Sequence, residues 1–499
     1  MSVFCRVLLL VGVLAVETLA AEYHVTPGGS ASGDGSAERP WDLQTALSGG
    51  PSQGDSTTVR PGDVIWIHGG TYRGGFKCQV AGNATAQVTI RAFPGERATI
   101  DCRPRDARDD GLFDVRGDYC VIRGLEFTCS DPKRETTISG SWPEDIRRGG
   151  IFSRASHVRF INLVIHDLAN GIGFWSQGEG GEVYGCLISH NGWKGPDRGH
   201  GHAIYAQNES GTKRIEDNIL FNQFGSGIHC YGSEKAALND FHIEGNVSFN
   251  NGCLTKPEER TSALLLGGGT PVRRGTVVGN FTYGGSSRFG YSLSTTNEDL
   301  KLVGNYFVGN VSVCNFANVT ARQNTVVQPN GLVHLQQSPE NDLALWTWDE
   351  NTYYRTGTAY ADFELQIGPR SRGHTEDEWR RNTGLDRHSQ FHRGRPTQTR
   401  VFVRPNRYEP GRGHLVIYNW ETSKTVDVDL SGVLQAGQKF RIVSAQNFYG
   451  LALVTGMFRG DPVRIPMQPV APAAPVGMSD FPLPITEPEF GVFVVLAEK

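Results

Sequence analysis

The sequence predicts an all-β fold, in which a right-handed parallel β-helix solenoid with an asparagine ladder precedes a small antiparallel β-sandwich. Three observations predict it. A strand–turn–strand segment recurs from residue 119 to residue 328, a second apolar strand follows most copies, and alternating strands of another kind fill residues 400–499. The 499 residues are enough for two such domains.

The N-terminus predicts a secretory signal peptide over residues 1–21. Arg6 precedes an apolar run from Val7 to Val16, and Ala20 and Ala21 supply small residues for cleavage. The run is too short to span a membrane and no second one follows, so no membrane span is expected. A buried N-terminal helix is the alternative. We expect a secreted or periplasmic mature chain that starts near Ala21 or Glu22.

A repeated turn predicts the solenoid over residues 22–335. Copies such as "GEVYGCLISHN" (181–191) and "KRIEDNILFNQ" (213–223) recur at intervals from 19 to 38 residues, which are one coil or a coil plus a loop. Asn tolerates the left-handed conformation of a tight turn, and stacked Asn amides at the ~4.8 Å strand spacing form a ladder. The turn position holds Asn162, Asn218, Asn246, Asn280, Asn305 and Asn324, with Cys186 and Gly124 in two other copies.

The second repeated strand predicts the interior of the coils. Period-2 alternation places one apolar residue per coil on a common inward face. These residues are Ile151, Ile172, Ile204, Ile228, Leu264 and Tyr291. Three short strands per coil with variable loops specify a parallel β-helix, whereas a propeller needs four strands per blade and a steadier period.

The remainder of the chain predicts a connecting segment over residues 336–399 and a sandwich over 400–499. Within "TEDEWRRNTGLDRHSQF" (375–391), Thr375 and Glu378 form a capping box for a short helix. Strands such as "HLVIYNW" and "KFRIVSAQ" alternate as in a sandwich. Trp420 and Tyr449 are candidates for sugar contact, with a core or interface role as the alternative.

Composition and cysteine content narrow the function. The formal net charge of −4 and the pI near 6.4 provide no basic field, so no nucleic-acid partner is expected. Eight cysteines remain after Cys5 leaves with the signal. In an exported protein they can pair or serve as small core residues, and both interpretations stay open. No CxxC motif supports zinc.

One face of the second strand collects the candidate site. Tyr205 and His229 occupy equivalent outward positions on adjacent coils, so their backbones should lie ~5 Å apart. The loop at 190–201 adds charged and aromatic groups, and His202 takes the turn position equivalent to Asn170 and Ser226. Candidate catalytic residues are Tyr205, His229, His202, Arg198 and Tyr231, and candidate substrate-binding residues are Trp175, Arg154, Lys194, Trp193 and Gln207. The same outward row is expected to continue over Leu265 to Ser292 and Ser294.

The opening of the mature chain resembles a known family. "YHVTPGGSASGDGSAERPW" followed by "VRPGDVIWIHGGTYRGGF" is similar to the start of secreted, pectate-lyase-like β-helix proteins that act on carbohydrates. The "W…TG.D.HS" pattern in 375–391 and the C-terminal sandwich are similar to elements that follow β-helices in such proteins. The resemblance implies a polysaccharide-active protein, but this fold hosts lyases, hydrolases, epimerases and binders.

We expect a lyase that cleaves an acidic, uronate-containing polysaccharide by β-elimination. His229 or His202 is the candidate base, Tyr205 or Tyr231 the acid, and an arginine or lysine the partner of the substrate carboxylate. Trp175 can stack on a sugar ring. A uronate epimerase would use nearly the same groups.

Two other functions remain open, and a metal site is a separate candidate. A hydrolase needs two carboxylic acids, and Asp197 and Glu234 are loop candidates for them. A non-catalytic binder needs the aromatic groove alone. For a metal, His200 and Asp197, joined by His202, are weak candidate ligands, and the resemblance allows Ca²⁺ that bridges a uronate. The expected partner is an anionic polysaccharide and the expected state is a monomer.

Overall fold

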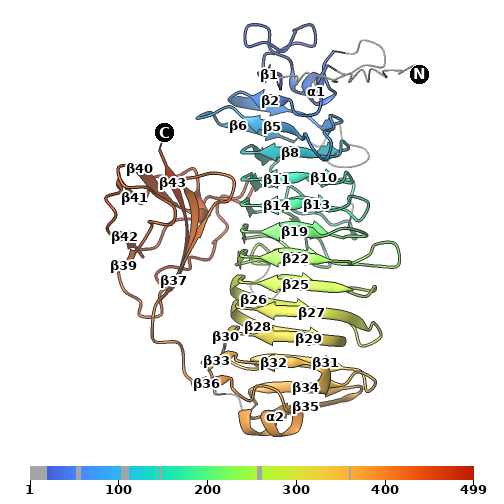
Figure 1. Cartoon of the computed structure of the whole chain (residues 1–499), viewed down its shortest axis with the longest axis vertical. Helices are drawn as coiled ribbons and strands as arrows, with labels where there is room; N and C mark the ends of the chain where they lie inside the picture. The colour runs from blue at the N-terminus through green and yellow to red at the C-terminus, as the bar shows by residue number, and fades with distance from the viewer. Residues whose placement is uncertain are drawn as a thin grey trace, which may run out of the picture.

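The computed structural model describes residues 20–51, 58–102, 112–141, 143–146, 149–255, 261–358 and 361–498. It confirms the predicted fold class: a tall right-handed parallel β-helix with an antiparallel β-sandwich beside it (Figure 1). The predicted signal peptide lies outside the described residues, apart from its last two. Among the residues described, no helix is long and apolar enough to cross a membrane.

Each coil contributes strands to three faces, and the first face is a continuous parallel sheet of twelve strands. Short, apolar-alternating segments suit these strands because each one buries only its inward side chains. The twelve strands are β1 (Glu22–Val25), β2 (Val64–Ile67), β5 (Val88–Ala92), β8 (Cys120–Arg123), β11 (Arg159–Ile161), β14 (Glu182–Tyr184), β19 (Lys213–Glu216), β22 (Phe241–Glu244), β25 (Arg274–Val278), β27 (Asn297–Val303), β29 (Phe316–Arg322) and β32 (Thr347–Asp349).

The second face follows the ladder turn. Its strands are β3 (Gly70–Arg73), β6 (Ala98–Asp101), β9 (Glu126–Thr128), β12 (Val164–His166), β15 (Leu187–Ser189), β20 (Ile219–Phe221), β23 (Val247–Phe249), β30 (Thr325–Gln328), β33 (Thr352–Arg355) and β36 (Gln390–Arg393). Two long strands, β26 (Phe281–Phe289) and β28 (Tyr306–Cys314), bend from this face into the next, so the two faces form one sheet.

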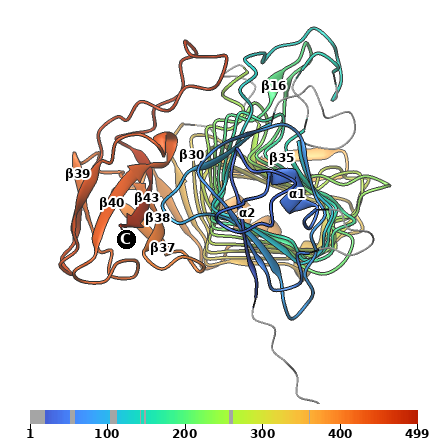
Figure 2. The same cartoon turned by 90° about the horizontal axis from the view of Figure 1, so that it is seen from above.

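The third face carries the candidate site and is called the groove face. Its strands are β4 (Phe76–Cys78), β7 (Phe113–Val115), β10 (Ile151–Ser153), β13 (Ile172–Phe174), β18 (Ile204–Ala206), β21 (Ile228–Cys230), β24 (Ser262–Leu266), β31 (Val333–Gln337) and β34 (Phe363–Ile367), with β35 (Arg370–His374) antiparallel to β34. A two-stranded hairpin, β16 (Trp193–Lys194) and β17 (Gly199–His200), leaves this face between β15 and β18. Figure 2 shows β16 on loops that project from the coils.

The asparagine ladder is present. Each Asn side chain donates from Nδ2 to Oδ1 of the next Asn at 2.9–3.0 Å, and the series ends at Asn351. The predicted member Asn162 is wrong by one position, because Leu163 is the residue equivalent to Cys186. Asn162 and Gly124 instead occupy the left-handed position just before the ladder, where φ is 54° and 69°.

The interior confirms most of the predicted stack. The side chains of Ile151, Ile172, Ile204, Ile228 and Leu264 lie in register and are buried. Tyr291 is an error, because the strand ends at Phe289 and leaves Tyr291 45% exposed. Free, buried thiols stand at Cys78, Cys102, Cys120, Cys186, Cys230 and Cys314, so these six serve as core residues.

The β-helix continues beyond residue 335, the predicted end. Parallel pairing extends through β33 and β36 as far as Arg393. Helix α2 (Glu376–Thr383) then closes the stack, and its capping box of Thr375 and Glu378 is present as predicted. Asp386 ends the ladder by accepting hydrogen bonds from Trp379 (2.8 Å) and Asn351 (3.3 Å). The "W…TG.D.HS" pattern is therefore a structural cap. A single-turn helix, α1 (Leu43–Leu47), covers the other end.

The sandwich packs on the second face. It contains the five-stranded sheet β37 (Arg400–Pro405), β38 (Arg412–Tyr418), β43 (Phe490–Ala497), β40 (Lys439–Ser444) and β41 (Val454–Met457), and the pair β39 (Thr425–Val428) and β42 (Val463–Pro466). Its residues Tyr418 and Phe490 share one buried apolar cluster with Phe249 and Phe281. Trp420 is also buried, where its Nε1 donates to Tyr306. This packing leaves the groove face uncovered.

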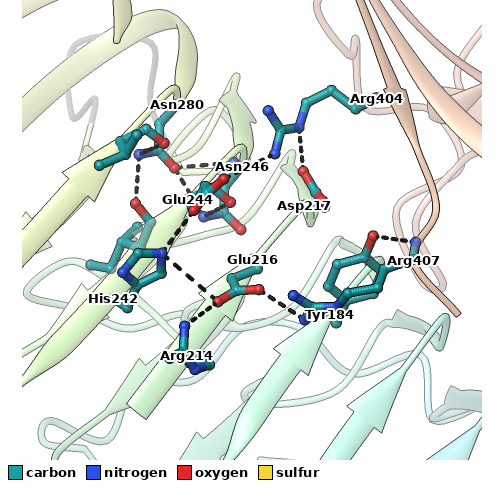
Figure 3. A network of polar contacts seen from close by, with 12 residues as sticks. Tyr184, Arg214, Glu216, Asp217, His242, Glu244, Asn246, Asn280, Arg404 and Arg407 are labelled. Carbon is teal, nitrogen blue, oxygen red and sulfur yellow. Dashed lines mark hydrogen bonds and ion pairs between the residues drawn. The ribbon is translucent and has the colours of Figure 1, made fainter. Parts of the chain in front are cut away.

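Ion pairs connect the sandwich to the corner between the first and second faces (Figure 3). Arg404 pairs with Asp217, and Arg407 pairs with Glu182 and, at 2.9 Å, with Glu216. The backbone N–H of Arg407 also donates to the Tyr184 hydroxyl at 2.7 Å. Apolar packing and charge pairs therefore both hold the sandwich against the β-helix.

Candidate functional site

A groove of about 730 Å³ lies on the groove face, over the coils that contain β13, β18, β21, β24 and β26. Its lining is rich in aromatic and basic side chains. They include His200, His202, His229, Tyr205, Tyr231, Tyr291, Trp175, Trp193, Arg198 and Arg288. No carboxylate belongs to the lining that the described residues form. The groove therefore suits a polar, negatively charged ligand with flat faces.

The expected pairing of Tyr205 with His229 is present. The two residues are in register on the neighbouring strands β18 and β21, and their ring centroids lie 5.0 Å apart. Both side chains are half-buried on the outward face. The parallel β-helix thus brings a phenol and an imidazole together because residues at equivalent coil positions stack at the strand spacing.

His202 lies where the turn prediction placed it. Its backbone N–H donates to Asn170 Oδ1 at 3.0 Å, and its Nδ1 accepts from the Ser226 backbone N–H at 2.9 Å. Accepting at Nδ1 places the proton of the neutral ring on Nε2. The His202 ring stacks on that of His229 at 4.0 Å with an angle of 5° between the planes. His202 therefore holds the position of the His229 ring.

The electrostatics keep both imidazoles neutral. Burial lowers the pKa of His229 to about 4, and the nearby charge of Arg198 acts in the same direction. Burial, with a smaller effect of His229, lowers the pKa of His202 well below its usual value. The Nδ1 atom of His229 is buried and has no hydrogen-bond partner in the described part of the chain. His229 is thus an unprotonated imidazole at neutral pH, the form that a general base requires.

Tyr205 has the opposite property. Burial raises its pKa to about 12, so the phenol keeps its proton at neutral pH. Trp175 lies next to it, with ring centroids 5.4 Å apart. Gly173 provides the space for this ring, because a Cβ at that position would lie 2.8 Å from the Trp175 ring and 2.6 Å from that of Phe152. The centre of the groove therefore joins a protonated phenol to a flat indole surface.

The β16–β17 hairpin forms one wall of the groove. Trp193 and His200 face each other across it and stack at 5.0 Å with 6° between their planes. The Nε2 atom of His200 lies 2.9 Å from Asp197, and this hydrogen bond lowers the pKa of Asp197. Arg198, at the tip, is exposed and lines the groove.

The candidate metal ligands do not converge. His200 and Asp197 bond to each other, while His202 bonds within its turn. In the part of the chain that the structure describes, no three His, Cys, Asp or Glu side chains are arranged to hold a metal ion.

Three predicted binding residues do not line the groove. Lys194 points away along the hairpin and pairs with Glu135 at 3.2 Å. Arg154 lies near Asp114, two coils before Tyr205. Gln207 donates to the backbone oxygen of Tyr231 at 3.2 Å, so it supports the floor. Glu234, a predicted hydrolytic acid, is exposed in a loop outside the lining.

Arg288 and Tyr291 are site residues that the sequence analysis missed. Arg288 is in register with Leu265, in the same outward row as Tyr205 and His229, and Tyr291 packs edge-on against Tyr231 at 5.4 Å. Both errors have one cause, because the residues of β26 in register with Leu264 and Leu265 are Ser287 and Arg288, four positions before the predicted Tyr291 and Ser292. The apolar residue Phe289, which is buried in register with Leu266, was the available signal.

Comparisons with known proteins agree with the fold. A family model described as a right-handed β-helix region matches residues 76–270. No curated protein sequence matches the chain.

Three solved structures illustrate the structural similarity. A pectate lyase is 17% identical, with a TM-score of 0.38, and the match covers 70% of this chain and 75% of that one. A lacto-N-biosidase from Eubacterium ramulus is 14% identical, with a TM-score of 0.43 and coverage of 75% and 68%. A rhamnogalacturonan lyase is 15% identical, with a TM-score of 0.41 and coverage of 74% and 87%.

Proposed function

We propose that the chain is a polysaccharide lyase that cleaves an acidic, uronate-containing polysaccharide by β-elimination in the groove. One observation carries the proposal: Tyr205 and His229 lie side by side, with Arg198 and Arg288 in the same lining and no carboxylate among the described lining residues. Elimination needs a base, an acid and a cation, whereas glycoside hydrolysis needs two carboxyl groups.

In the proposed reaction, the substrate carboxylate binds Arg288 or Arg198. The cation stabilises the negative charge that develops when the proton next to the carboxylate is removed. His229 takes this proton, and the electron pair forms a carbon–carbon double bond as the bond to the leaving glycosidic oxygen breaks. Tyr205 donates its proton to that oxygen. The proton on His229 then returns to the Tyr205 phenolate, which restores the site.

The pKa values support these roles. An acid with a pKa of about 12 stays protonated until a strongly basic leaving oxygen forms. A base with a pKa of about 4 is free of its proton in the empty groove, and a bound substrate carboxylate would raise that pKa toward the working range. Trp175 offers a flat surface for a sugar ring beside the reacting unit.

The test is a continuous ultraviolet assay on a panel of polyuronates and sulfated glycosaminoglycans, with and without Ca²⁺. We expect absorbance from the new conjugated double bond on at least one substrate. H229Q and Y205F should each lower the rate by about 10²-fold or more. His334 lies in the same outward row, farther along the groove face and outside the groove, so H334Q is the matched control and should retain activity.

Other outcomes identify the alternatives. New reducing ends without the absorbance would contradict the lyase and indicate hydrolysis. A change of uronate configuration without chain cleavage would indicate an epimerase. Tight glycan binding without any product would indicate a binding protein, and the loss of rate in H334Q would refute the assignment of residues.

A further inference from the structure

A second cavity, of about 640 Å³, lies between the β-helix and the sandwich, away from the groove. Both domains provide its walls: strands β5, β6 and β8 of the coils on one side, and residues of β38, β40 and β43 on the other. In Figure 1, β40 and β43 stand at the height of β8 and β11. The lining contains five arginines, Arg91, Arg97, Arg123, Arg412 and Arg441.

The carboxylates around this junction cavity already have partners. Glu126 accepts from Arg97 at 2.6 and 2.7 Å and from His166 at 2.9 Å. Glu96 accepts from the Gly69 backbone N–H at 2.5 Å. Glu409 accepts from Asn162 at 2.8 Å. Glu126 is therefore paired with Arg97, whereas Glu96 and Glu409 accept these bonds from neutral donors and keep their negative charge.

Three of the arginines have no carboxylate partner. Within the described ranges, Arg91, Arg123 and Arg441 form no ion pair, and Arg123 donates only to the backbone oxygen of Tyr408, at 2.6 Å. Burial, together with the neighbouring charge of Arg123, lowers the pKa of Arg91. Glu498, the other acid in the lining, is exposed at the rim. The lining thus holds five arginines and four carboxylates, and three of the arginines have no carboxylate at ion-pair distance among the described residues.

Arg412 gives the clearest sign of a ligand. The residue is only 8% exposed, and its Nε and Nη2 atoms have no hydrogen-bond partner among the residues described. Its Nη1 atom pairs with Glu409 at 3.8 Å, which leaves the other two donors unused. A buried guanidinium with unsatisfied donors is costly unless an anion approaches it. The cavity beside it has room for such a group.

Aromatic rings complete the lining. Phe448 lies 5.8 Å from the Arg412 guanidinium, and Tyr449, which is 45% exposed, lies under Arg97 at 3.6 Å. Flat rings beside arginines are the combination that holds an acidic sugar, with its ring against the aromatic surface and its anionic group on the guanidinium. We propose that the junction cavity is a second binding site for an acidic saccharide unit, through its carboxylate or sulfate.

The identity of the ligand as a unit of the substrate polymer rests on the proposed function, but the site can be tested without turnover. We would titrate the whole chain with inorganic sulfate and with short oligosaccharides of galacturonate and of mannuronate, by calorimetry. R91Q/R441Q removes two unpaired cavity charges. R459Q/R464Q removes two exposed charges elsewhere on the sandwich and is the matched control. R412M tests the buried arginine, with circular dichroism as the check on folding.

We expect two oligosaccharides per wild-type chain. R91Q/R441Q and R412M should weaken binding at the junction site by about tenfold or more, because each removes charge-assisted hydrogen bonds. Turnover of short oligosaccharides should be unchanged in R91Q/R441Q, and H229Q should leave the junction site intact. If the wild-type chain binds two oligosaccharides but cleaves none of those tested, the proposed function fails while the junction site stands.

Two results would overturn the proposal. If R91Q/R441Q binds like R459Q/R464Q, the junction cavity is not a ligand site. If sulfate binding depends on Arg91 and Arg441 but no oligosaccharide binds there, the cavity holds a small inorganic anion and the saccharide assignment is wrong.

Discussion

Replacing Asn280 with alanine should destabilise the β-helix far more than its size suggests. Its Oδ1 accepts from the Asn246 backbone N–H at 3.0 Å and from Asn246 Nδ2 at 2.9 Å, and its Nδ2 donates to Asn305 Oδ1 at 3.0 Å and to the Ile243 carbonyl at 2.9 Å. The side chain therefore connects three successive coils inside the protein.

The expected cost follows from which partners lose their only bond. Asn246 Nδ2 still donates to the Ile215 carbonyl at 2.7 Å, and Asn305 Oδ1 still accepts from the Asn280 backbone N–H at 2.9 Å. The Asn246 backbone N–H is left unsatisfied in a buried position, whereas the Ile243 carbonyl lies within the parallel sheet between β19 and β25. At roughly 1–3 kcal/mol for one such group, N280A should lower the free energy of unfolding by about 1–3 kcal/mol.

The assay is urea unfolding followed by far-ultraviolet circular dichroism. Asn318 is exposed and makes one side-chain hydrogen bond, to Asp299 at 3.0 Å, so N318A is the control and should cost less than about 0.5 kcal/mol. If the unfolding midpoint of N280A equals that of N318A, the ladder does not stabilise the coils in the way described here.

Three further predictions concern the groove and acid stability. R288Q should lower kcat/KM on an acidic polymer by about 10-fold to 100-fold, because the cation for the carboxylate is lost; an unchanged value would remove Arg288 from the site. D197N and E234Q should each keep activity within a few-fold in the same assay, whereas a hydrolase that uses these acids would lose it. Burial lowers the pKa of His190 to about 4 and that of His414 to about 3, so the unfolded state binds more protons below pH 6.5. The free energy of unfolding should therefore fall by about 3 kcal/mol per histidine from pH 6.5 to about pH 4, and H414Q should reduce this slope in urea unfolding at several pH values.

The sequence predicted those features that depend on a repeat. Residues at equivalent positions of successive coils lie in register. The repeat is therefore enough to predict that Ile204 lies next to Ile228 and Tyr205 next to His229. The prediction put Asn162 in the ladder, but it lies one position earlier, at the left-handed turn residue. Asparagine is common at both of these adjacent positions. Local pattern alone does not distinguish them.

Features that depend on a bend or a loop were less predictable. Arg288 follows a register change within β26, and Tyr291 lies beyond the end of that strand. Lys194 and Trp193 are adjacent residues of the hairpin, so their side chains point to opposite sides. Trp193 faces the groove and Lys194 faces away from it. The loop sequence alone does not indicate this hairpin. The junction cavity requires two domains to meet, and no periodicity within either domain indicates where they do.

Stacking has an evolutionary consequence for the groove face. Each coil pairs only with the coil before and the coil after it, so an exchange of one outward residue alters one subsite and leaves the other coils in place. Leu265, the position next to His229, is thus a modular site, whereas Gly173 has no space for a side chain. We expect that substituting Leu265, rather than remodelling the scaffold, is the shortest route to a different glycan specificity.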